Sequence, residues 1–237
     1  MKEKLVLALD VDNREKAETL VKELKDYVGV FKVGKELFTA EGPSIFKMIR
    51  DNGGKIFADL KYHDIPNTVA SAARTLVRHG VEIFNVHASG GYEMIKKTRE
   101  AIEDEAAKLG VKRPIFLAVT VLTSLNDDDM KRIKVSESAK EHVLTLAKLA
   151  KEAGADGIVC SPQEIEMIKR EIGADFITLT PGVRPVWAAA GDQKRVMTPK
   201  EAVDKGTDYI VVGRPITGAT DRIDAAKKIV MEMEGKI

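Results

Sequence analysis

Short apolar runs rich in β-branched residues alternate along this chain with longer segments of helical periodicity. Eight such runs are found, at 5–10, 30–33, 55–61, 82–87, 115–121, 157–160, 176–180 and 209–212. Their length and composition predict buried β-strands. Strands that alternate with helices are typical of a parallel sheet covered by helices, so the chain is predicted to be an α/β protein.

The segments between these runs predict the helices and their ends. The helices are expected at 14–27, 42–52, 67–79, 92–109, 137–153, 162–171 and 221–234. Asp12 or Asn13 is the expected N-cap of the first, and glycines such as Gly80 and Gly110 follow the ends of others. With no composition break over 1–237, the prediction is a single (β/α)8 TIM barrel domain. A doubly wound open sheet is the alternative, but its Gly-x-Gly-x-x-Gly fingerprint is absent.

Charge, cysteine content and the length of apolar segments exclude several classes of protein. The chain of 237 residues has 38 basic and 37 acidic residues and a net charge of +1, so no overall field favours nucleic acid or a membrane surface. Cys160 is the one cysteine, which excludes an internal disulfide framework. No apolar segment has the length of a transmembrane helix or the layout of a signal peptide, so we expect a cytoplasmic protein.

Charged residues gather at the carboxyl ends of three consecutive predicted strands. Side chains alternate along a strand, so Asp59 and Lys61 share one face of the third strand, while Lys32 points inward from the second. Asp10 ends the first strand. In a barrel these ends meet at one mouth, where working residues lie. Other polar residues at such ends are Asn85, His87, Thr120, Thr123, Thr180, Arg184, Gly213 and Arg214.

Two glycine-containing turns after the last strands suit a phosphate group. Residues 180–185 read Thr-Pro-Gly-Val-Arg-Pro and residues 212–215 read Val-Gly-Arg-Pro. Backbone N–H groups at such turns favour an anion, and arginine adds bidentate contacts. Between these turns, residues 187–197 have the length and the small residues of a mobile lid, or of an ordinary exposed loop.

Two other readings of the polar residues are weaker. Residues 29–35 match the start of a P-loop, but Glu36 stands where that motif needs Ser or Thr. A divalent metal held by Asp10, Asp59 and Asp64 is conceivable. The neighbouring lysines would compete with it, and the four histidines lack metal-ligand spacing, so no metal is expected.

Several of these stretches resemble the orotidine 5′-phosphate decarboxylase family, in its bacterial type. The resemblance runs nearly end to end and rests on residues 7–10, 31–34, 59–68, 119–124, 180–184 and 212–216. It implies conversion of orotidine 5′-phosphate to UMP in pyrimidine biosynthesis, without metal or cofactor, by a homodimer.

The resemblance also implies residue roles. Lys61 would be the proton donor, with Asp59 beside the substrate carboxylate and Lys32 orienting Asp59. Asp64 and Thr68 would reach across the dimer interface into the partner's site. The substrate-binding residues would be Asp10 at the ribose hydroxyls, Thr123 at the pyrimidine, and Arg184, Gln193, Gly213 and Arg214 at the phosphate.

Two other functions compete with this one. Magnesium-dependent sugar-phosphate decarboxylases and aldolases also carry Asp-x-Lys-x-x-Asp, but they resemble this chain less because they have an acidic residue at the position of Lys32. A barrel that only binds a nucleotide as a sensor would bind UMP without turnover. Activity that survives EDTA separates the first competitor, and turnover separates the second.

Overall fold

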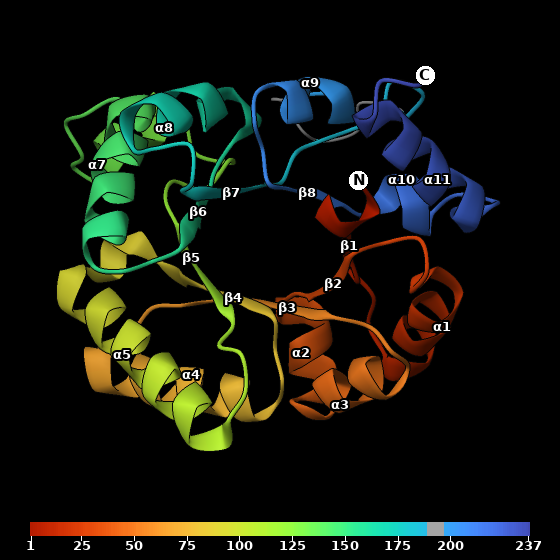
Figure 1. Ribbon diagram of the computed structural model, residues 1–237. Helices are drawn as coiled ribbons and strands as arrows, with labels where there is room; N and C mark the ends of the chain where they lie inside the picture. The colour runs from red at the N-terminus through yellow and green to blue at the C-terminus, as the bar shows by residue number, and fades with distance from the viewer. Residues whose placement is uncertain (189–196) are drawn as a thin grey trace.

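A ring of parallel strands with helices outside it forms the centre of the molecule (Figure 1). The computed structural model describes residues 1–188 and 197–237. Within these residues the strands are β1 (Leu5–Ala8), β2 (Val30–Val33), β3 (Ile56–Tyr62), β4 (Ile83–His87), β5 (Ile115–Val119), β6 (Gly157–Val159), β7 (Ile177–Thr180) and β8 (Tyr209–Val212). They pair in chain order, and β8 pairs with β1 to close the barrel. The predicted (β/α)8 barrel is confirmed.

The helices lie outside the strands and cover the barrel. They are α1 (Arg14–Leu24), α2 (Lys35–Glu41), α3 (Ser44–Asp51), α4 (Pro66–Arg78), α5 (Tyr92–Leu109), α6 (Asp127–Arg132), α7 (Ala139–Glu152), α8 (Ile165–Glu171), α9 (Pro199–Asp204), α10 (Arg214–Thr217) and α11 (Arg222–Met233). Short 3₁₀ helices are η1 (Lys2–Lys4), η2 (Ala88–Gly90) and η3 (Pro162–Glu164). No helix in the described residues has the length and apolar content needed to cross a bilayer.

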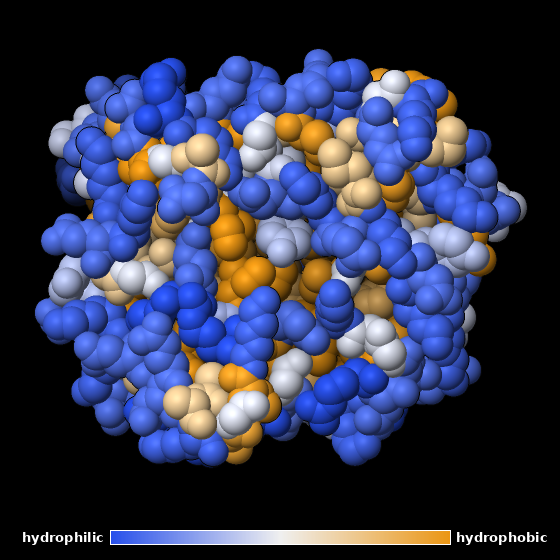
Figure 2. Space-filling view, viewed as in Figure 1, coloured by the Kyte–Doolittle hydropathy of each residue, from blue (hydrophilic) through white to orange (hydrophobic). Residues whose placement is uncertain are grey.

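Two apolar layers hold the barrel together. The larger lies between the strands and the helices and includes Leu5, Phe31, Phe84 and Phe116, all with at most 1% of their surface exposed. The smaller fills the barrel interior and consists of Val6, Val30, Phe57, Ile83, Leu117, Val119, Val159 and Leu179. Figure 2 shows apolar side chains gathered in a central hollow, surrounded by a mostly hydrophilic rim. This interior layer lies below the mouth of the barrel, where polar side chains can be placed.

One close approach explains a glycine at the start of β6. A Cβ atom at Gly157 would lie 2.1 Å from the carbonyl oxygen of Ile177 on β7. No side chain fits there, so the strand that carries Val159 into the barrel interior has to begin with glycine.

Candidate active site

A pocket of about 200 Å³ opens at the carboxyl ends of the strands. Its polar wall is formed by Lys32, Asp59 and Lys61. Apolar side chains from the other strands face them, among them Val119, Val159, Leu179 and Val211. The pocket therefore places two ammonium groups and a carboxylate against a surface that excludes water.

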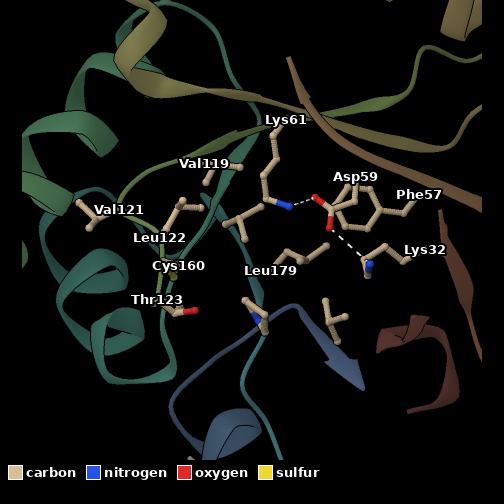
Figure 3. Close-up of a pocket in the computed structure, with 13 residues that line it drawn as sticks. Lys32, Phe57, Asp59, Lys61, Val119, Val121, Leu122, Thr123, Cys160 and Leu179 are labelled. Atoms are coloured by element: carbon tan, nitrogen blue, oxygen red, sulfur yellow. Dashed lines mark hydrogen bonds and ion pairs between the residues drawn. The ribbon is translucent and has the colours of Figure 1, made fainter. Parts of the chain in front are cut away.

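The charged side chains form a continuous chain of opposite charges. Lys61 Nζ lies 2.5 Å from Asp59 Oδ1, and Lys32 Nζ lies 3.5 Å from Asp59 Oδ2. Lys32 Nζ also donates to Asp10 Oδ1 at 3.1 Å. The Asp59 side chain is only 14% exposed, and the two lysines approach it from opposite sides (Figure 3). Desolvated charges are costly unless they are paired, and here each has a partner.

A second hollow, of about 330 Å³, adjoins the first. It shares Lys32, Asp59 and Lys61 with the pocket and adds Asp10 from the end of β1. A side chain placed at Gly213, after β8, would meet Asp10 Oδ2 at 3.7 Å. The predicted convergence of Asp10, Lys32, Asp59 and Lys61 on one mouth is therefore what the structure shows.

The backbone of Lys61 is unusual, because its φ angle is +53°, in the left-handed region. Its N–H donates to Asn85 Oδ1 at 2.9 Å, and Asn85 Nδ2 donates to Asp59 Oδ1 at 2.8 Å. From the sequence, Asn85 was expected only as a polar residue at a strand end, without a role. The available signal was an amide at an inward-facing position of an otherwise apolar strand.

The residues predicted to bind phosphate follow β7 and β8. Arg184 is buried, and its backbone N–H donates to the carbonyl of Met197. Gly213 precedes α10, and Arg214 begins that helix with an exposed side chain that lines a groove between α1 and α10. Neither arginine lines the two hollows described above. Gln193 lies outside the described residues, as does most of the predicted lid, 189–196.

Three more predicted positions follow β3 and β5: Asp64 lies in the loop after β3, Thr68 in the first turn of α4, and Thr123 in the loop after β5. Thr123 lines the pocket beside Leu122 (Figure 3). Asp64 and Thr68 are exposed and line neither hollow, and the Asp64 carboxylate accepts the N–H of Ile65. Within one chain, therefore, Asp64 and Thr68 do not join the other predicted site residues.

Burial shifts the pKa values of two side chains near the mouth of the barrel, Cys160 and His87. Cys160 lines the pocket, and burial raises the pKa of its thiol, so the thiol stays protonated. Burial also lowers the pKa of His87, assisted by the positive charges of His63 and Lys61. The His87 ring lies 5.8 Å from the ring of His63, away from the pocket wall. The Cys160 thiol is therefore not a thiolate nucleophile at neutral pH, and the His87 ring lies outside the pocket lining.

Comparisons with known proteins agree with this geometry. The family model described as orotidine 5′-phosphate decarboxylase / HUMPS family matches residues 3–229. A protein of Moorella thermoacetica named orotidine 5′-phosphate decarboxylase is 50% identical over 98% of this chain and 93% of its own length. One of Pseudoalteromonas translucida with the same name is 51% identical over 93% of this chain and 92% of its own.

Solved structures show the same likeness. The crystal structure of orotidine 5′-phosphate decarboxylase from Lactobacillus acidophilus superposes with a TM-score of 0.85 at 41% identity, covering 96% of this chain and 97% of that one. The enzyme of the same name from Pyrococcus horikoshii gives a TM-score of 0.77 at 28% identity, covering 98% and 99%.

Proposed function

This chain is an enzyme that belongs to the orotidine 5′-phosphate decarboxylase / HUMPS family, and on that premise we propose how its residues convert orotidine 5′-phosphate to UMP. The observation that carries the proposal is the Lys61 ammonium, held 2.5 Å from Asp59 at the wall of an apolar pocket. Loss of CO2 from C6 of the pyrimidine leaves a carbanion in the ring plane, which the π system does not delocalise. A fixed ammonium stabilises that charge and then supplies the proton.

The neighbouring charges give Lys61 its position. Asp59 receives Lys61 on one oxygen and faces Lys32 with the other, so Lys32 orients Asp59 and the ion chain extends to Asp10. Such preorganised charges in a water-poor pocket stabilise developing charge without reorganisation during the reaction. Removal of CO2 and protonation then need only the substrate and these side chains.

We propose that residues around the mouth of the barrel bind the substrate. Asp10 is proposed to bind the ribose hydroxyls, and Thr123 is proposed to contact the pyrimidine. The backbone of Gly213 and the side chains of Arg184, Gln193 and Arg214 are proposed to bind the 5′-phosphate. The contact position of Gly213 against Asp10 supports adjacent ribose and phosphate sites. Phosphate contacts far from C6 supply binding energy for orientation at the ring.

A homodimer with shared sites is also proposed. Asp64 and Thr68 are exposed outside the pocket, next to Ile65, a large apolar side chain that is 67% exposed. An interface there would cover Ile65 and bring both polar residues to the partner's mouth. We further propose one domain over 1–237, since β8 pairs with β1, and the cytoplasmic location remains a prediction.

The test is turnover of orotidine 5′-phosphate, followed by absorbance in EDTA. We expect the wild type to be active and Lys61→Ala to lose at least about 10⁴-fold in kcat, since both electrostatic stabilisation and proton donation are removed. Lys47→Ala is the matched control, because Lys47 Nζ also lies 2.5 Å from a carboxylate, that of Asp51, on the outer helix α3. Wild-type turnover only with added magnesium would instead favour the sugar-phosphate branch. UMP binding without turnover would favour a sensor.

A further inference from the structure

Asn85 is the buried amide that contacts both halves of the Asp59–Lys61 pair. It lies on β4, has no exposed surface, and faces the barrel interior between Ile83 and His87. Its Oδ1 accepts the Lys61 N–H at 2.9 Å, and its Nδ2 donates to Asp59 Oδ1 at 2.8 Å. A backbone N–H can only donate and a carboxylate only accept, so these partners fix which way the amide points.

The sheet is irregular where Asn85 contacts it. Along β3 and β4 the pairing runs Ala58 with Phe84 and then Tyr62 with Val86, so the register shifts between Ala58 and Tyr62. The residues between them leave the regular ladder, and Lys61 takes a left-handed φ that a non-glycine side chain rarely adopts. A buried N–H without a ladder partner needs another acceptor, and Asn85 Oδ1 is that acceptor.

The same amide fixes the carboxylate of Asp59. Asp59 Oδ1 receives both Lys61 Nζ and Asn85 Nδ2, while Oδ2 faces Lys32. With nitrogen groups on both oxygens, the carboxylate plane cannot rotate without breaking a contact. A side chain at position 85 therefore needs one acceptor and one donor at this reach, and asparagine supplies both.

We propose that Asn85 is a positioning residue for decarboxylation: it holds the Lys61 backbone in its left-handed conformation and the Asp59 carboxylate in its plane, so that the ammonium points at the reacting carbon. This inference rests on the proposed function and adds a residue to it. Asn85 acts through Lys61 and Asp59 and needs no contact with the substrate.

The first variant is Asn85→Leu, which keeps the branched side-chain skeleton and removes both hydrogen bonds. Because misplacement of a reacting group by about 1 Å costs about 100-fold, we expect kcat to fall by roughly that factor. The dissociation constant for UMP, measured by titration calorimetry, should stay within about 3-fold, since ribose and phosphate contacts are made by other elements. Thr178→Val is the matched control: it removes a buried hydrogen bond from β7, on a side chain that lines neither hollow, and should leave kcat unchanged.

The second variant is Asn85→Asp. If Asn85 had a purely structural role, the ratio of variant to wild-type kcat would not depend on pH. The charged groups around position 85 are Asp59 and Lys61 on β3 and, beyond Asp59, Lys32 on β2; its sheet partner on β5 is the apolar Leu117. Ionised, the new carboxylate repels Asp59; protonated, it donates to Asp59 as the amide does. The ratio of variant to wild-type kcat should therefore rise as the pH falls from about 8 to about 5.

Each outcome decides the inference. A flat ratio for Asn85→Asp, or wild-type kcat in Asn85→Leu, would overturn it while leaving the proposed function intact. If Asn85→Leu does not fold, the pH ratio of Asn85→Asp alone decides. Equal losses of UMP affinity and kcat would assign Asn85 to general stability, against the inference. A wild type that does not turn over orotidine 5′-phosphate would overturn the proposed function and this inference together.

Discussion

Glu232 is a buried carboxyl on α11, next to the loop that follows β7. It is 1% exposed, and its Oε1 accepts the N–H of Val186 at 3.3 Å. Its Oε2 has no hydrogen-bond partner in the part of the chain that the structure describes. Burial raises the pKa of this carboxyl. An ionised Glu232 is therefore a cost to the folded state, carried at neutral pH.

The sign of this cost gives a stability prediction for Glu232→Gln. Because the folded pKa lies above the unfolded one, both states are protonated at low pH and Glu232 costs little. As the pH rises between the unfolded and the folded pKa values, the unfolded state ionises first and the folded state is disfavoured. At every pH above both pKa values the full cost remains. At pH 7 we expect Glu232→Gln to raise the Tm by roughly 2–4 °C, the shift that about 1 kcal/mol gives at this size. Near pH 4 the two proteins should melt together.

Glu141→Gln is the control with the opposite sign. Glu141 closes the capping box of α7, and hydrogen bonds from Ser138 lower the pKa of its carboxyl. A lowered folded pKa contributes stability above the unfolded pKa, which is lost as the pH falls. Glu141→Gln should therefore lower the Tm at pH 7. A Glu232→Gln variant that melts below the wild type at pH 7 would contradict the assignment.

Individual site residues differ in how far the sequence could reveal them. Strand alternation predicts that Asp59 and Lys61 face inward together, and both line the pocket, although the left-handed φ of Lys61 departs from regular strand geometry. The role of Asn85 depends on the register shift between β3 and β4 and on the left-handed Lys61, which no periodicity encodes. Of the predicted phosphate arginines, Arg184 lies in the loop after β7 and Arg214 begins the short helix α10, and the paths of such segments depend on tertiary contacts.

At the scale of elements, a repeated Gly-x-acid motif braces pairs of strands. Three of its occurrences, at 80–82, 154–156 and 206–208, lie just before β4, β6 and β8. Its glycines have φ angles of 68°, 96° and 94°. Each glycine lies in the turn that follows the preceding helix, where a positive φ favours glycine. Its carboxylates accept the N–H of Ile56, Phe116 and Thr178 on the preceding strands. Each acid therefore links an even strand to the odd strand before it.

Asp156 is the most heavily bonded of these acids. It accepts the Phe116 N–H at 2.9 Å and binds Arg99 at 2.7 Å and Arg113 at 2.6 Å. Burial alone would raise its pKa, but the Arg113 and Phe116 hydrogen bonds hold the pKa below its ordinary value. Asp156→Ala should lower the free energy of unfolding by roughly 2–4 kcal/mol, because it leaves the Phe116 N–H without its acceptor and the two arginines without their half-buried carboxylate. Denaturant titration measures this.

Glu103→Ala is the matched control for Asp156→Ala. Glu103 contacts the same arginines, at 2.6 Å and 4.0 Å, but it is 51% exposed, and within residues 1–188 and 197–237 its carboxylate accepts no strand N–H. An exposed ion pair of this kind contributes less than about 1 kcal/mol. Equal losses in the two variants would mean that the link between β5 and β6 adds nothing.

Several helices and strands were predicted with the correct bounds. The helix at 92–109 and the strands at 30–33 and 209–212 have the predicted bounds, and Asn13 is the N-cap of α1. Four short α-helices were missed: α2, α6, α9 and α10, each of four to seven residues. Helices this short are held by packing and caps, so the periodic signal in the sequence is weak.

For the whole molecule, closure of the barrel decides which residues meet. Asp10 and Gly213 are far apart in the chain, yet they lie side by side because β8 pairs with β1. Asp64 and Thr68, by contrast, lie outside the mouth of their own chain. Under the proposed sharing of Asp64 and Thr68, a complete site requires two chains.

Mixed dimers test this sharing directly. Lys61→Ala and Asp64→Ala should each be nearly inactive as homodimers, because every site lacks one residue. When the two chains are co-expressed with different tags, a mixed dimer contains one site with both residues intact and one site with neither. Random pairing makes about half of the dimers mixed, so the mixture should regain about a quarter of wild-type activity. Purified mixed dimers should reach about half. If Asp64 served its own chain, every site in the mixed dimer would still lack one residue, and activity would stay at the level of the single variants.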